Sequence, residues 1–118
     1  MTPLQSKILT IIQAHGRDNP IAWQEVSGEL AAQGVRLGDR GIRREVGLLK
    51  NQGYYIVNTN GYWIATSADD YDTMMRVANT LEKHADSEYA ESRQIRAWAI
   101  ELKEKAQQKP KRVIVNQL

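Results

Sequence analysis

Basic and amide side chains that could bind an anionic partner cluster in the middle of the chain: Arg40, Arg43, Arg44, Lys50 and Asn51. With about 100° between successive helical residues, they share one side of a helix, and Ile42, Val46 and Leu49 occupy the other. Arginine and lysine bind phosphates and carboxylates, and arginine also binds guanine edges. The spacing predicts a basic helix face that binds a nucleic acid or an acidic protein; a face that is merely solvated would have the same pattern.

The surrounding residues predict the elements that position this face. Asp39 is expected to cap a helix over residues 40–51, and Gly53 to end it. Aromatic and β-branched residues at 54–58 and 62–66 favour two strands, and the intervening Asn60-Gly61 is typical of a hairpin turn. Asn58, Thr59 and Asn60 would lie at the tip of that hairpin. Three aromatic residues either pack the hairpin or stack on bases: Tyr54, Tyr62 and Trp63.

Two apolar helices are expected before the basic one. Residues 4–15 carry apolar side chains at three- and four-residue spacing, with Thr2 and Pro3 typical of a helix start. A loop with Asn19-Pro20 follows, and Ile21 could begin a very short strand. Residues 23–33 form the second helix, in which Trp23 shares a side with Val26 and Leu30 and is expected in the core.

Two glycines inside these helices lower helix stability. Gly28 lies in the second helix and indicates close packing there. Gly47 lies on the basic face, where either close approach of a phosphate or groove wall, or drift at a tolerant position, would explain it.

Residues 67–108 contain no Pro or Gly and predict a long helix that begins at Ser67. Apolar residues recur at three-four spacing, but Glu88 and Ser92 interrupt this seam. The helix could pair with a second copy, fold back as a hairpin, or bind another protein. It is expected to end before Pro110, leaving residues 109–118 as a basic tail. This tail could add a strand to a sheet edge or touch DNA backbone, but disorder is the simplest expectation.

Several classes of function find no support in the sequence. Cysteine is absent, and no GxxxxGK[ST], GxGxxG or HExxH motif occurs. His15 and His84 lack ligand or triad companions, and the acids near residue 70 fit helix capping. We therefore expect no enzyme activity, metal or cofactor. No stretch reaches the roughly 20 apolar residues that span a bilayer, so a soluble cytoplasmic protein is expected.

The order of helix, short strand, helix, basic helix and hairpin resembles the winged helix-turn-helix superfamily. The closest likeness is to the N-terminal domain of biotin operon repressors, with "LxxxGY" matched at residues 49–54 and the wing closing on Gly61-Tyr62. The start of the second helix, residues 20–26, resembles the "PIT-x-x-E-I" of such domains, with Ala22 in place of the capping Thr. The layout is also similar to small phage and prophage winged-helix proteins.

This resemblance implies a mainly α protein with a small β-hairpin (α+β). Residues 1–66 would form the winged domain, and residues 67–108 a helical extension for homodimerisation or partner binding. Helix 40–51 would enter the major groove of double-stranded DNA, and the wing at 58–61 would touch backbone or minor groove. The expected function is a phage-type transcriptional regulator or replication-origin binder. The alternative is an adaptor or inhibitor that binds an acidic protein partner.

Overall fold

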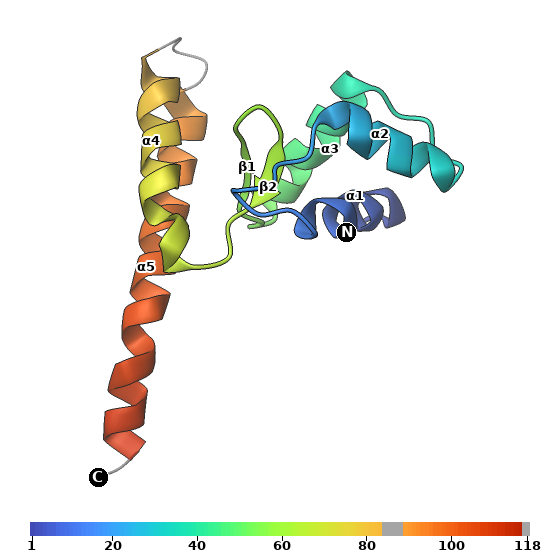
Figure 1. Ribbon diagram of the computed structural model, residues 1–118. Coiled ribbons are helices and arrows are strands. Elements are labelled where there is room, and N and C mark those ends of the chain that lie inside the picture. The colour runs from blue at the N-terminus through green and yellow to red at the C-terminus, as the bar shows by residue number, and fades with distance from the viewer. Residues whose placement is uncertain (84–88, 117–118) are drawn as a thin grey trace. The chain divides into compact units, whose positions relative to one another are not determined.

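The computed structural model describes residues 1–83 and 89–116, with side chains described through residue 107 apart from Tyr89. The chain divides into two compact units, Met1–Ala65 and Thr66–Leu118. The secondary structure is mainly helical with one small antiparallel sheet of two strands, so the fold is α+β (Figure 1).

Helix α1 (Pro3–Gln13) begins as the sequence predicts. The Thr2 hydroxyl accepts a hydrogen bond from the Gln5 backbone at 3.1 Å, and the Gln5 side chain accepts one from the Thr2 backbone at 3.2 Å. This reciprocal capping box satisfies two of the amides that a helix start leaves open. The helix ends two residues earlier than residue 15, because the His15 carbonyl accepts a hydrogen bond from Ile64 at 3.2 Å and leaves the helical path.

Helix α2 (Trp23–Ala32) follows a segment that pairs with the hairpin. Ile21 and Tyr62 form an isolated antiparallel bridge with hydrogen bonds of 2.8 and 2.7 Å, so the very short strand predicted at Ile21 is confirmed as one bridge. Ala22 offers no side-chain cap to α2. Gly34 ends the helix region with φ +81°, a backbone conformation that glycine adopts readily.

Helix α3 (Asp39–Asn51) is the predicted basic helix, with one correction at its start. Its N-cap is Gly38, and Asp39 is the first helical residue and makes no capping bond. The Asp39 carboxylate instead accepts a hydrogen bond from Arg43, which competes with capping for the same oxygens. The apolar side is confirmed, since Ile42, Val46 and Leu49 are at most 2% exposed. Gly53 follows with φ +100°.

Strands β1 (Ile56–Asn58) and β2 (Tyr62–Ile64) form the hairpin, with Ile56 opposite Ile64. Both strands are shorter than predicted. Asn60 and Gly61 make the turn with φ of 63° and 152°, as the Asn-Gly pair predicts. The core of the first unit gathers side chains from all three helices and the hairpin: Ile8, Ile12, Ile21, Val26, Leu30, Ile42, Leu49, Ile56 and Tyr62.

The second unit is a pair of helices. A 3-10 turn η1 (Ala68–Asp70), with the Ser67 hydroxyl accepting from Asp69 at 3.3 Å, leads into α4 (Tyr71–Glu82). Helix α5 (Tyr89–Asn116) packs against α4. Of the three outcomes expected for residues 67–108, the chain therefore adopts the folded-back one. Of the two interruptions in the seam, Glu88 lies outside the described residues, and Ser92 is buried.

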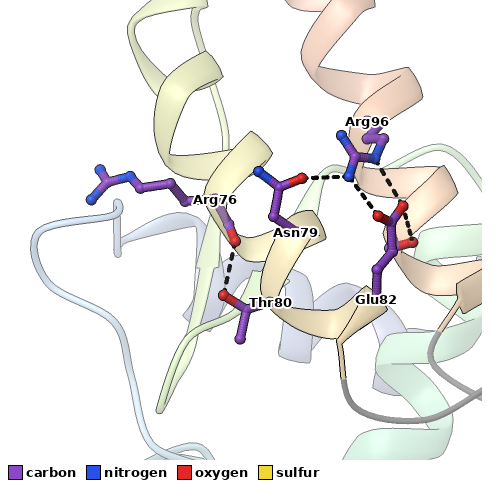
Figure 2. A network of polar contacts seen from close by, with 6 residues as sticks. Arg76, Asn79, Thr80, Glu82 and Arg96 are labelled. Carbon is purple, nitrogen blue, oxygen red and sulfur yellow. Dashed lines mark hydrogen bonds and ion pairs between the residues drawn. The ribbon is translucent and has the colours of Figure 1, made fainter.

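A polar network joins α4 to α5 (Figure 2). Arg96 donates from Nη2 to Glu82 Oε2 at 2.8 Å and from Nε to Glu82 Oε1 at 3.1 Å. It also donates to the Asn79 side chain, and the buried Ser92 hydroxyl donates to Glu82 at 3.1 Å. The same figure shows the Thr80 hydroxyl bonded to the Arg76 carbonyl within α4. Ser92 interrupts the apolar seam because it belongs to this network.

The end expected for the long helix before Pro110 is wrong. Helix α5 continues through Pro110 to Asn116. Proline removes one backbone hydrogen bond and disfavours helix at the residue before it, at a cost of about 3 kcal/mol, but it does not forbid a helix. Most of the segment expected to be a disordered tail therefore has helical backbone.

Candidate nucleic-acid interface

The basic face of α3 lies opposite the side that the core buries. Arg40 and Arg44 are exposed, and within the described part of the chain they make no hydrogen bond or ion pair. The Arg43 side chain is 68% exposed and Asn51 is exposed. Lys50 is half-buried and engaged in an interaction within the chain. Three guanidinium groups on α3 are thus available to an outside partner.

A buried glutamine holds α3 against α1. Gln5 is 6% exposed and its Nε2 donates to Glu45 Oε2 at 3.1 Å. Its Oε1 accepts from Gln52 Nε2 at 3.1 Å, so one side chain contacts α3 and the residue that caps its end. Sequence reasoning missed this brace. The available signals were a polar residue within the apolar stripe of α1 and an acid within a basic helix.

The hairpin turn is organised by its own side chains. Asn58 Oδ1 accepts from the Gly61 backbone at 3.0 Å, and Thr59 Oγ1 accepts from Trp63 Nε1 at 2.9 Å. Asn58 and Asn60 are exposed, whereas Thr59 is half-buried. Among the predicted hairpin residues, Asn58 and Asn60 are therefore accessible to a partner, although the Asn58 carbonyl oxygen and the Thr59 hydroxyl also hold the turn together.

The hairpin aromatics do not form a stacking surface. Trp63 is fully buried, Tyr62 is 5% exposed and lies in the core, and Tyr54 is half-buried against the core. Trp23 is also packed against the core, as predicted, although it borders an open groove beside the hairpin turn. The packing alternative for these aromatic residues is the one that the structure adopts.

An open groove of about 280 Å³ lies where the starts of α2 and α3 meet the hairpin turn. It brings Arg43 together with Asn58 and Asn60, three of the predicted site residues. The other five do not line it. Of the remaining lining residues, Gly61 belongs to the predicted wing at 58–61, and Tyr62 is one of the aromatic residues expected either to pack or to stack on bases. Trp23 is expected in the core, and the sequence gives no site role to Ala22, Gln24 or Asp39.

The charges in this groove oppose one another. Arg43 Nε donates to Asp39 Oδ1 at 3.1 Å, so a carboxylate lies beside the only cation among the lining residues. The start of α2 borders the same groove without a side-chain cap, and a helix start carries a partial positive charge. Because the Asp39 carboxylate offsets the charge of Arg43, the groove is less basic than the α3 face beside it, despite the partial positive charge at the start of α2.

The residues that the structure describes contain neither a metal-binding cluster nor a membrane-spanning helix. No three His, Asp or Glu side chains there come close enough to hold a metal ion. No helix in that part of the chain has the length and apolar character needed to cross a bilayer. His15 Nδ1 lies 2.7 Å from the Asn19 carbonyl and helps to close the loop after α1.

No protein-family model, curated protein or solved structure matches this chain.

Proposed function

We propose that this protein is a winged helix-turn-helix protein that binds double-stranded DNA. In this proposal α3 enters the major groove, and the hairpin turn at residues 58–61 contacts backbone or minor groove. The observation that carries it is the exposure of Arg40, Arg43 and Arg44 on the side of α3 opposite its buried residues. A transcriptional regulator or a replication-origin binder would both use such a surface.

The shape of this surface supports DNA over a small anionic ligand. The major groove is about 12 Å wide and admits one helix with its side chains. The guanidinium groups follow one side of α3 rather than converging on a point, so they suit an extended polyanion. Arg43 shares a groove with Asn58 and Asn60, so a duplex that contacts α3 there also meets the turn.

The support beneath α3 favours a preorganised interface. Hydrogen bonds from Gln5 to Glu45 and from Gln52 to Gln5 fix α3 against α1. The Ser27 hydroxyl donates to the Leu37 carbonyl at 2.7 Å and fixes the connector before α3. A helix held at both ends loses little conformational freedom on binding, which favours affinity.

A second candidate is a protein-interaction module for an acidic partner. One observation favours it: Leu48, four residues after Arg44 on α3, is 41% exposed. An apolar side chain beside arginines is common at protein interfaces, although it could also contact a thymine methyl group. The two candidates use the same face and differ in the partner.

Gel-shift titration of a random-sequence duplex pool, followed by sequencing of the bound fraction, tests the proposal. Arg43→Ala and Arg44→Ala should each weaken binding to the selected site by about 1–3 kcal/mol. Arg76→Ala, which removes an exposed arginine from α4 in the second unit, is the control and should bind as the wild type does. Unchanged affinity in both α3 variants would overturn the proposal. A palindromic site would favour binding as a homodimer.

A further inference from the structure

Helix α5 carries a self-complementary surface. Four exposed side chains, spaced by four, three and four residues, share one side of the helix: Arg93, Ala97, Ile100 and Glu104. We call them the α5 stripe. At about 100° per residue they fall within an arc of roughly 60°, opposite the buried Ile95. Ile100 is 48% exposed, one of the most exposed large apolar side chains in the described residues.

Helix α4 packs behind most of the α5 stripe. The hydrogen bond from Ser92 to Glu82 marks one end of the packing between the two helices. The Lys103 ammonium, 4.6 Å from the centre of the Tyr71 ring, marks the other. Helix α4 has 12 residues and α5 has 28, and Figure 1 shows α5 running on beyond α4. The stripe therefore lies on the side of α5 that faces away from α4, and its Arg93 also takes part in an interaction within the chain.

We propose that the α5 stripe pairs with the same stripe of a second copy of the chain, with the two helices antiparallel. The three-four spacing is that of a coiled-coil seam. Arg93 and Glu104 lie equally far on either side of the midpoint between Ala97 and Ile100. A two-fold axis at that midpoint places Arg93 opposite the partner's Glu104, and Ala97 opposite the partner's Ile100.

Charge and size both determine this direction. A parallel pair would place Arg93 against the partner's Arg93 and Glu104 against the partner's Glu104, and like charges in contact are destabilising. The antiparallel pair makes two opposite-charge contacts, one at each end. Between them, the small Ala97 leaves room for the partner's Ile100, as a knob enters a hole. The interface is isologous, so it closes as a dimer and does not propagate.

The stripe is short, which predicts a weak dimer. A single helix face of this length buries less than the roughly 1,600 Å² of a standard stable interface. We therefore expect a monomer–dimer equilibrium that is visible only at high protein concentration. This inference does not depend on DNA binding, and its test contains no DNA, so either proposal can fail while the other stands.

Sedimentation equilibrium of the full chain from about 1 μM to 1 mM tests the pairing. Arg93→Glu and Glu104→Arg should each weaken dimerisation by about tenfold or more, because each creates like-charge contacts at both ends. The double variant should restore association to near the wild-type value. Arg76→Glu on α4 is the matched control and should leave it unchanged. A monomer throughout, or a dimer that none of these changes weakens, would overturn the proposal.

Disulfide cross-linking tests the direction, because the natural chain has no cysteine. In the antiparallel pair, a mixture of Arg93→Cys and Glu104→Cys chains should cross-link to each other far more than either variant does to itself. The two positions are 11 residues apart, or about 16 Å along a helix, so like cysteines lie too far apart to bond. Efficient cross-linking of each variant with itself would contradict the antiparallel arrangement.

Discussion

The Nε atom of Arg43 donates a hydrogen bond to Oδ1 of Asp39 over 3.1 Å, one turn earlier in α3, and both side chains line the groove beside the hairpin turn. The contact directs Arg43 toward the groove, and the carboxylate offsets part of its charge. In the proposed interface Asp39 would face the same phosphates as Arg43 and would oppose them. Asp39 should therefore stabilise the fold and weaken binding.

Asp39→Asn should separate these two effects. The free energy of unfolding should fall by about 0.5–1 kcal/mol, because a partly exposed ion pair and a favourable helix-dipole contact are lost. Duplex affinity should rise several-fold, because a like charge next to phosphate is removed. Urea unfolding and fluorescence polarisation on a duplex measure the two effects. Asp18→Asn in the exposed loop before α2 should change neither, and a loss of DNA affinity in Asp39→Asn would contradict this account of the groove.

Gly61→Ala should destabilise the first unit by about 1–3 kcal/mol. Gly61 has φ 152°, and a Cβ there would lie 2.9 Å from the Pro20 Cβ and 3.2 Å from the Ile21 backbone. The variant therefore forces the hairpin away from the segment that it pairs with. Gly34→Ala is the control, since its φ is +81° but its Cβ would meet nothing within 4 Å. Equal thermal destabilisation of the two variants would show that the close approach is unimportant.

Gly28→Ala and Gly47→Ala should each raise the free energy of unfolding by about 0.5–1 kcal/mol, the helix-propensity gain of alanine over glycine. A Cβ at either position meets nothing within 4 Å, which shows that the packing expected at Gly28 is absent among the described residues. If α3 lies close to a groove wall, Gly47→Ala alone should weaken DNA binding. Equal DNA affinity of the two variants would favour the tolerant-position explanation for Gly47.

The stability of the second unit should depend on pH through Glu82. Hydrogen bonds from Arg96 chiefly hold the pKa of this carboxyl below its ordinary value, with a smaller contribution from Ser92, while burial opposes them. A carboxyl with a lowered pKa stabilises the fold above its ordinary pKa, and this stabilisation is lost as pH falls through the lowered value. The contribution of Glu82 to the urea midpoint should therefore change little between pH 7 and pH 5. At pH values below about 4 this contribution should be lost, and the midpoint should decrease.

Glu82→Gln is the comparison for that titration, because it keeps the size of the side chain and removes its charge. The difference in urea midpoint between wild type and Glu82→Gln should be largest at pH 7 and should shrink below about pH 4. A difference that stays constant from pH 7 to pH 3 would show that the ion pair contributes nothing.

Much of the first unit could be predicted from sequence, because local signals agree with the packing. Thr2 and Pro3 predict the start of α1, and Asn60-Gly61 predicts the turn that the backbone makes. The apolar side of α3 follows from spacing alone, since Ile42, Val46 and Leu49 are all buried. These features depend on residues within a few positions of one another.

What the sequence did not show depends on contacts between distant residues. Gln5 and Glu45 are 40 positions apart, and nothing local to either predicts their hydrogen bond. Asp39 is a typical N-cap residue, so the sequence predicts a cap there. Nothing in the sequence shows that Arg43 would instead hydrogen-bond the Asp39 carboxylate. Pro110 predicts a helix end because proline generally disfavours a helix, although α5 continues through it.

The candidate site could be predicted only where it depends on residues close together in the sequence. Periodicity places Arg40, Arg43 and Arg44 outward, and the structure agrees. Periodicity cannot show that the Thr59 hydroxyl accepts a hydrogen bond from Trp63, or that the start of α2 shares a groove with Arg43. Those relationships arise only when the hairpin folds against the helices.

The salt dependence of duplex binding tests the central claim most directly. Affinity for the selected duplex should fall steeply as salt rises, with a log–log slope of about −0.9 for each phosphate neutralised. Replacing Arg40, Arg43 and Arg44 together by alanine should make that slope less negative by about one for each arginine that contacts phosphate. A slope near zero for the wild type, or the same slope in the triple variant, would contradict DNA binding through α3.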